Sequence, residues 1–311
     1  MSTSTHVAII GGGIMGGDIA TVFAAKNWTV HVMSPSLKTR EALPARLKAG
    51  LEKVGASKDC AQQVHCYEQL ETLPWQTIDL VIEAVTEDLA LKKALFAKIE
   101  TLARADTPIT TNTSNFQIGA VTEGLKSASR MAGLHFFMPA HLVPLVEVVS
   151  ASTTNTEVAG QLETLMKAIG KAPIRVNKDI PGFVGNRLQQ ALMREAMWMI
   201  NDGVIDAEGI DTAVRFGFGF RFVACGPFLQ KEMSGWDTNF AVASALYPTL
   251  HNETTPPPFF KAMVEKGHVG MKAQHGFWQW TAESITQEKA RIEKALQAGF
   301  AILDSDKPKH D

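Results

Sequence analysis

A glycine-rich loop near the start of the chain constrains the fold more than any other part of the sequence. The apolar run at residues 6–10 is typical of a buried strand, residues 11–16 carry the pattern G-x-G-x-x-G, and an amphipathic helix follows. Glycines in this pattern permit a tight turn, let the backbone approach a pyrophosphate and let the helix pack closely on the sheet. The helix N-terminus adds free N–H groups and a positive dipole end for phosphates. We therefore predict a dinucleotide site formed by Gly11, Gly13, Ile14, Met15 and Gly16.

Strand-like and helix-like segments alternate as far as residue 180. Further strands are predicted at residues 29–33, 79–85, 108–112, 131–136 and 142–150. This alternation is typical of a largely parallel sheet with helices on both faces. A Pro-Gly turn at residues 181–182 then gives way to long helical periods. We predict an α/β protein with a Rossmann-type NAD(P)-binding domain over residues 1–182 and an all-α C-terminal domain over residues 183–311.

The composition argues against several classes of protein. The chain of 311 residues has a net charge of −2 with its lysines and arginines spread out, whereas a nucleic-acid surface needs a basic stripe. Its three cysteines lack paired spacing, so we expect neither disulfides nor a metal site. No apolar run reaches the length of a membrane span, and the N-terminus lacks the basic start of a secretory signal. We expect a cytoplasmic protein that acts on a small molecule, without nucleic acid or membrane as a partner.

The end of the second predicted strand leaves the choice of dinucleotide open. An acidic residue at this place holds the ribose hydroxyls of NAD in Rossmann domains, but here the place falls on Ser34. A serine cannot bind two hydroxyls through one carboxylate, and it does not repel a 2′-phosphate. Ser36, Lys38 and Arg40 follow within reach of such a phosphate. Two interpretations stand: a site that accepts or prefers NADP, and a weakened NAD site with Lys38 and Arg40 in solvent.

A histidine and a glutamate form the candidate catalytic pair. His135 lies at the carboxyl end of the predicted strand at residues 131–136, and ligands of open α/β sheets bind at the carboxyl ends of strands. Glu147 lies inside the apolar run at residues 142–150, where an unpaired carboxylate would be costly to bury. If the connection folds back, Glu147 accepts the Nδ1–H of His135 and leaves Nε2 facing a substrate. The pair would then stabilise the imidazolium, so that the ring can take a hydroxyl proton near neutral pH.

Motifs along nearly the whole chain resemble those of the 3-hydroxyacyl-CoA dehydrogenase family and keep their order and spacing. They are GGGIMG at 11–16, VIEAVTEDLALKKALF at 81–96, TNTSNFQI at 111–118, AGLHFFMP at 132–139, LVEVVS at 145–150 and KDIPGFVGNRL at 178–188. The resemblance implies a Rossmann domain followed by a helical substrate and dimerisation domain, and hence a homodimer. It also implies oxidation of an L-3-hydroxyacyl-CoA to the 3-oxoacyl-CoA by NAD or NADP, a reaction of fatty acid metabolism.

The resemblance further implies roles for individual residues. His135 takes the place of the catalytic base, and Glu147 that of its orienting partner. Ser114 falls at the serine that contacts the substrate and the nicotinamide. Glu87 and Lys92 fall at positions that line the cofactor and acyl-CoA site. Asn186 falls at the position of a substrate-side asparagine.

Departures from the family pattern keep other functions open. Met138 replaces an asparagine of the family, and a thioether cannot donate a hydrogen bond near the reacting oxygen. The segment at 35–78 is shorter than the helical excursion with which acyl-CoA members grip CoA. Arg221 is similar to an arginine of relatives that oxidise free 3-hydroxy acids, such as carnitine and gulonate dehydrogenases; it either clamps a carboxylate or packs on the surface. The alternatives are a dehydrogenase of a small free 3-hydroxy acid and a catalytically weak dinucleotide-binding or crystallin-like protein.

Overall fold

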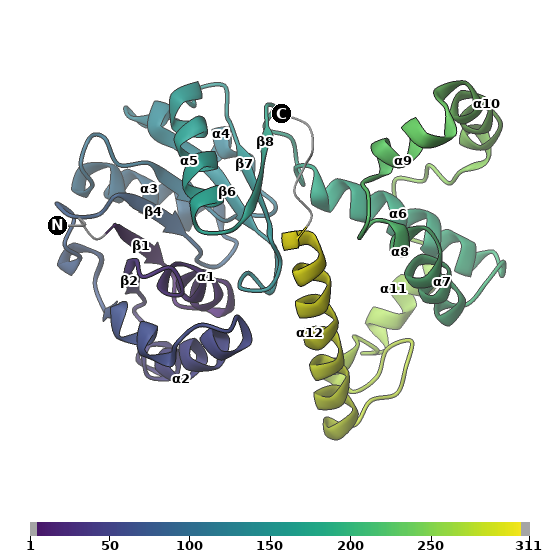
Figure 1. Cartoon of the computed structure of the whole chain (residues 1–311), viewed down its shortest axis with the longest axis horizontal. Coiled ribbons are helices and arrows are strands. Elements are labelled where there is room, and N and C mark those ends of the chain that lie inside the picture. Colours follow the sequence, from purple (N-terminus) through teal and green to yellow (C-terminus); the bar gives the residue numbers. More distant parts are fainter. Residues whose placement is uncertain (1–4, 306–311) are drawn as a thin grey trace. The chain divides into compact units, whose positions relative to one another are not determined.

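The computed structural model describes residues 5–305, and residues 1–4 and 306–311 lie outside the described part (Figure 1). The chain divides into two compact units, residues 1–186 and residues 187–311. A sheet with helices forms the first unit, and helices with their connecting loops form the second. The predicted fold class, a Rossmann-like domain followed by a helical domain, is confirmed.

The first unit is built on an eight-stranded sheet. Its strands are β1 (His6–Ile10), β2 (Thr29–Met33), β3 (Val64–Tyr67), β4 (Leu80–Glu83), β5 (Ile109–Thr111), β6 (Met131–Phe136), β7 (Leu145–Val149) and β8 (Ala172–Val176). Their order in the sheet is β3-β2-β1-β4-β5-β6-β7-β8. Neighbouring strands are parallel except β6 and β7, which are antiparallel. The strand order reverses beside β1, which is where open α/β sheets bind their ligands.

The two edge strands, β3 and β8, are not predicted by the sequence pattern. Side chains of both strands are exposed or half-buried along most of their length. A central strand such as β4, in contrast, is buried at every position, and its first three residues are all apolar. The hydrophobic pattern therefore detects the inner strands and gives no signal for the edges.

Helices cover both faces of the sheet (Figure 1). They are α1 (Ile14–Ala24), α2 (Leu37–Lys53), α3 (Leu89–Leu102), α4 (Ile118–Val121) and α5 (Thr156–Ala168). Because successive side chains of a strand point to opposite faces, Val7 and Ile9 of β1 join the core beneath α1, α2 and α5. Ala8 and Ile10 join the second core, beneath α3 and α4. The two cores fix the sheet, so that the loops at the carboxyl ends of β1, β4, β5 and β6 share one edge.

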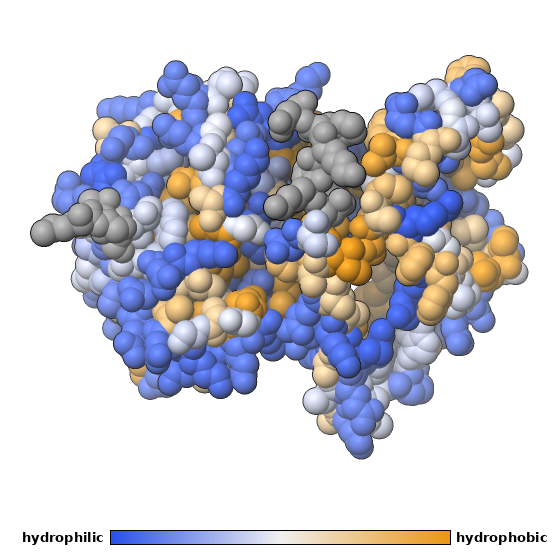
Figure 2. Space-filling model, viewed as in Figure 1, coloured by the Kyte–Doolittle hydropathy of each residue, from blue (hydrophilic) through white to orange (hydrophobic). Residues whose placement is uncertain are grey.

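The second unit consists of helices with little buried surface. It contains most of α6 (Gly185–Asn201), followed by α7 (Ala207–Ala213), α8 (Gly219–Arg221), α9 (Pro227–Ser234), α10 (Trp236–Leu246), α11 (Pro258–Glu265) and α12 (Ala282–Ser305). Among its described residues only Ala196, Met197 and Pro257 are buried. Apolar side chains gather on the surface of this unit (Figure 2), and three from α9 and α10 are at least 75% exposed: Phe228, Met233 and Phe240. The second unit therefore presents an apolar surface that its own helices leave uncovered.

None of the helices within residues 5–305 has both the length and the apolar character that crossing a bilayer requires. In the same part of the chain, no group of three or more His, Cys, Asp or Glu side chains is arranged to hold a metal ion. A cytoplasmic location stays a prediction from the sequence.

Candidate active site

The glycine-rich loop connects β1 to α1 and closes tightly on the sheet. Gly11 has a φ of +115°, and a Cβ there would meet the carbonyl oxygen of Ala84 at 2.5 Å. A Cβ on Gly16 would lie 1.7 Å from the carbonyl oxygen of Gly11, so only glycine allows this packing. Gly13, the N-cap of α1, has open space beside it and no side chain that could cap the helix. The loop therefore fits the close approach of a dinucleotide pyrophosphate to the backbone N–H groups of α1.

Arg46 of α2 places a positive charge beside this loop. Its guanidinium donates to the carbonyl oxygens of Gly12, Gly13 and Ile14 at distances of 3.0–3.3 Å. These bonds hold the loop in shape and bring a cation close to the phosphate position. No pattern in the local sequence predicts this contact.

Ser34 lies at the end of β2, next to the glycine-rich loop. Its side chain is buried, and a Cβ on Gly12 would lie 3.2 Å from the Cβ of Ser34. The structure thus brings the residue predicted on the ribose side to the loop. Of the two cations that follow, Lys38 is exposed, while Arg40 turns back and donates to the carbonyl oxygen of Ser34 at 2.7 Å.

His135 and Glu147 face each other across the antiparallel pair β6–β7, where they occupy the same register position. The Nδ1 of His135 lies 2.7 Å from Oε2 of Glu147, and both side chains are buried. The other carboxylate oxygen accepts the backbone N–H groups of Val184 and Gly185, at 2.9 and 2.8 Å. Asn186, the predicted substrate-side residue, follows directly in the chain. The strand register, rather than the connecting loop, sets the contact between His135 and Glu147.

The carboxyl of Glu147 is held in its ionised form. Burial alone would raise its pKa, but the hydrogen bonds from His135, Gly185 and Val184 outweigh burial and lower the pKa below its usual value. An ionised carboxylate can only accept hydrogen bonds, so Nδ1 of His135 carries the proton in this contact. Nε2 is then the ring nitrogen that can accept a proton from a substrate.

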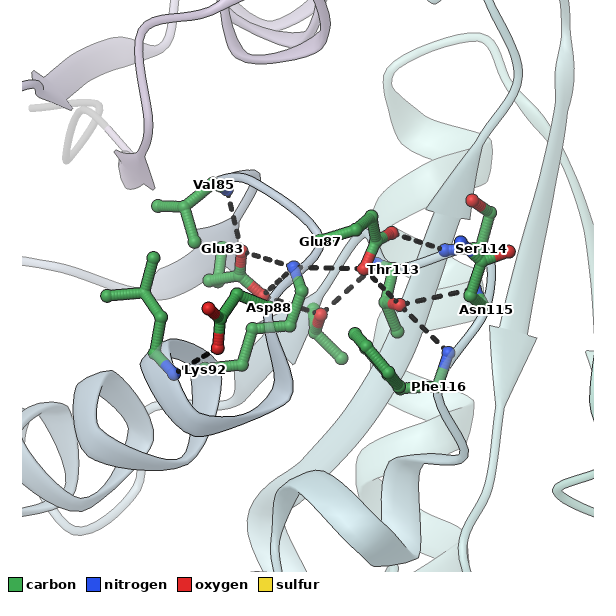
Figure 3. A network of polar contacts seen from close by, with 11 residues as sticks. Glu83, Val85, Glu87, Asp88, Lys92, Thr113, Ser114, Asn115 and Phe116 are labelled. Carbon is green, nitrogen blue, oxygen red and sulfur yellow. Dashed lines mark hydrogen bonds and ion pairs between the residues drawn. The ribbon is translucent and has the colours of Figure 1, made fainter. Parts of the chain in front are cut away.

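A second buried ion pair supports the loop that carries Ser114 (Figure 3). Lys92 of α3 is 1% exposed, and its Nζ lies 2.7 and 2.9 Å from the two carboxylate oxygens of Glu83, which is fully buried. The same ammonium lies 3.7 Å from Glu87. Glu87 in turn accepts the backbone N–H of Ser114 at 3.0 Å and the hydroxyl of Thr113 at 2.9 Å. A continuous chain of polar contacts therefore runs from the end of β4 to Ser114.

The network places Lys92 and adds residues that are not among the predicted ones. The family resemblance puts Lys92 at the cofactor and acyl-CoA site; in the structure its ammonium contacts Glu83 and, through Glu87, connects to the Ser114 loop. Glu83 and Thr113 are not among the predicted residues. Glu83 has the same signal as Glu147, a carboxylate inside an apolar run, whereas Thr113 has no such signal.

The loop between β6 and β7 carries Met138, whose side chain is 69% exposed. Lys171 holds this loop, since its Nζ donates to the carbonyl oxygens of Ala140 and Val143 at 2.6 and 2.8 Å. Burial lowers the pKa of Lys171 to about 8, so the ammonium is mostly charged at neutral pH. Arg221, the other predicted substrate residue, lies at the end of α8 in the second unit and is exposed.

Two family models match consecutive parts of the chain. Residues 6–180 match the family described as 3-hydroxyacyl-CoA dehydrogenase, NAD binding domain, and residues 182–280 match the C-terminal domain of the same family. The chain belongs to the 3-hydroxyacyl-CoA dehydrogenase family. The predicted enzyme class and NAD-type cofactor are thereby confirmed, with the choice between NAD and NADP still open.

Relatives in this family differ in the substrates that their names give. The chain is 37% identical to 3-hydroxyadipyl-CoA dehydrogenase of Escherichia coli K12, over 89% of this chain and 59% of that protein. It is 32% identical to the human mitochondrial hydroxyacyl-coenzyme A dehydrogenase, over 88% and 91%. The crystal structure of 5-formyl-3-hydroxy-2-methylpyridine 4-carboxylic acid 5-dehydrogenase, an NAD⁺-dependent enzyme, has a TM-score of 0.89 at 28% identity and covers 98% of this chain and 100% of its own. The family therefore includes substrates with and without CoA.

Proposed function

We propose that the protein interconverts an L-3-hydroxyacyl-CoA and the 3-oxoacyl-CoA with NAD(H). The buried His135–Glu147 pair carries this proposal. β1 and β6 point the same way through the parallel part of the sheet, so the glycine-rich loop and His135 lie at the same edge. A proton acceptor and a dinucleotide site at one sheet edge are the two parts that oxidation of an alcohol needs.

Each residue of the site then has a separate role in the proposed reaction. The glycine-rich loop and the N-terminus of α1 would hold the dinucleotide, which would supply the hydride acceptor for the carbinol carbon. His135 takes the hydroxyl proton on Nε2, while Glu147 holds Nδ1–H and stabilises the imidazolium that forms. The N–H groups of Val184 and Gly185 keep Glu147 in place. Ser114 supplies a hydroxyl to the reacting oxygen, and Glu87 fixes the backbone that carries it.

A small free acid is the second candidate substrate, and one comparison favours it. Compared structure with structure, the pyridine carboxylate dehydrogenase covers 98% of this chain at a TM-score of 0.89, whereas the 3-hydroxybutyryl-CoA dehydrogenase of Escherichia coli K12 covers 90% at a TM-score of 0.73. The named substrate of the pyridine carboxylate dehydrogenase is a carboxylic acid without CoA. Met138 offers an exposed thioether in place of an amide donor, and the guanidinium of Arg221 has the chemistry to bind a carboxylate.

A turnover screen would decide between the two substrate classes. Acetoacetyl-CoA and a set of free 3-hydroxy acids would each be assayed with NAD(H) and with NADP(H). We expect acetoacetyl-CoA reduction with a kcat/KM about 10²-fold above that of any free acid, a typical discrimination for a missing binding group. Turnover of a free acid alone would transfer the assignment to the second candidate, and absence of turnover with every pair would contradict both.

We also propose that the protein is a homodimer that forms through the helical unit. Phe228, Met233 and Phe240 stand in solvent, and so large an uncovered apolar surface is rare on a monomer. Multi-angle light scattering at micromolar protein should give about twice the chain mass of 33.8 kDa. A mass of one chain at this concentration would contradict the proposal.

A further inference from the structure

The carboxyl end of β2 carries Ser34 in place of the acidic residue that is usual in Rossmann domains, but an acidic residue follows the neighbouring strand β3. β3 lies beside β2, and the backbone N–H of Ser34 donates to the carbonyl oxygen of Tyr67 at 2.9 Å. Glu68 is the next residue after Tyr67. A carboxylate therefore reaches the same end of the sheet from β3 instead of β2.

Arg40 connects this carboxylate to the strand end. Its guanidinium donates to the carbonyl oxygens of Ser34 and Pro35, at 2.7 and 3.0 Å, and to Oε2 of Glu68 at 3.1 Å. The Arg40 side chain is only 16% exposed, while that of Glu68 is 66% exposed. Arg40 is thus fixed by the backbone, and Glu68 covers it from the solvent side.

This ion pair borders the place of the adenosine ribose. A Cβ on Gly12 would lie 3.0 Å from Cγ2 of Thr39, the residue before Arg40, and 3.2 Å from the Cβ of Ser34. The N–H of Gly11 donates to the carbonyl oxygen of Met33 at 2.8 Å, so the loop and the strand end form one surface. In Rossmann domains this surface holds the ribose hydroxyls of NAD or the 2′-phosphate of NADP.

The charges of the pair determine which of the two groups is favoured. A nearby arginine accommodates a 2′-phosphate, whereas a carboxylate binds ribose hydroxyls and repels the phosphate. Here Glu68 neutralises the arginine that donates to the carbonyl oxygens of Ser34 and Pro35. We propose that Glu68 is the specificity-determining residue of the cofactor site, and that it keeps the site selective for NAD by pairing with Arg40. The proposal rests on the dinucleotide site and is independent of the substrate assigned above.

Calorimetric titration of the full-length protein with NADH and NADPH, without substrate, tests this role. The unchanged protein should bind NADH more tightly than NADPH. Glu68→Gln should tighten NADPH binding about tenfold and change NADH binding less than about threefold, because the removed charge acts mainly on the 2′-phosphate. Glu71→Gln is the matched control: Glu71 is similarly exposed but pairs with Lys98, and we expect it to leave both affinities unchanged.

Arg40→Ala shows whether the pairing itself is responsible. In the Glu68→Gln background, loss of Arg40 should remove the gain in NADPH affinity, because no cation is then released to the phosphate. Glu68 is exposed, so its substitution keeps the fold, and retained NADH binding verifies this in each variant. The proposal is overturned if Glu68→Gln leaves the ratio of NADPH to NADH affinity unchanged, if Glu71→Gln shifts it equally, or if the double variant keeps the gain. Absence of acetoacetyl-CoA turnover would affect the proposed function and leave these binding measurements intact.

Discussion

Replacing His135 by glutamine is expected to lower kcat by about 10²–10⁴-fold, with little change in the affinity for NADH. Glutamine keeps a polar side chain beside Glu147, but it cannot take up the proton of a substrate hydroxyl. Steady-state kinetics in both directions would measure kcat, and calorimetric titration would measure NADH binding. The effect should appear in kcat because the proton moves in the transition state and not when the substrate binds.

His6→Gln is a matched control for this variant. His6 lies at the amino end of β1, at the edge of the sheet opposite the glycine-rich loop. We expect its turnover to stay close to that of the unchanged protein. Turnover by His135→Gln within about threefold of the unchanged protein would remove His135 from the mechanism, since a lost general base costs far more.

Local sequence patterns predict the parts of the fold that depend on local physics. The glycine-rich loop needs a positive φ at Gly11 and contact without a Cβ at Gly16, and both needs are visible as glycines in the sequence. The buried inner strands are visible as apolar runs. The edge strands β3 and β8 are partly exposed to water and combine polar with apolar side chains. Their own sequences therefore give no clear strand pattern, and they form strands by pairing with the neighbouring strand.

Some contacts between distant segments can be predicted from the sequence because a charged residue lies within an apolar run and needs a buried partner. Other contacts leave no such sign in the sequence. Glu147 lies in an apolar run, which predicts a buried partner for its carboxylate. The register of β6 and β7 places His135 opposite Glu147, so His135 is that partner. Glu83 carries the same signal, yet its partner Lys92 lies on a helix, where family resemblance alone suggests contact with the cofactor. Arg46 lies on α2 and Glu68 directly follows the edge strand β3, and no periodicity identifies their contacts.

Lys92→Met is expected to lower the free energy of unfolding by about 3–5 kcal/mol, because it leaves a buried carboxylate without its counter-charge. Glu83 is fully buried and, within residues 5–305, would keep only the N–H of Val85 and the hydroxyl of Thr111 as partners. Because Lys92 also contacts Glu87, the Ser114 loop should loosen as well. Urea unfolding followed by circular dichroism would measure the loss.

Lys93→Met provides the matched control, since the two lysines are adjacent on α3. Lys93 pairs with Glu123 at 2.7 Å, but both side chains reach solvent, so water replaces the lost partner and the unfolding midpoint should hardly move. Adding Glu83→Gln to Lys92→Met should recover part of the lost stability, because the double variant has no unpaired buried charge. Equal losses for Lys92→Met and Lys93→Met, or no recovery in the double variant, would show that the Glu83–Lys92 pair does not stabilise the site as a buried ion pair.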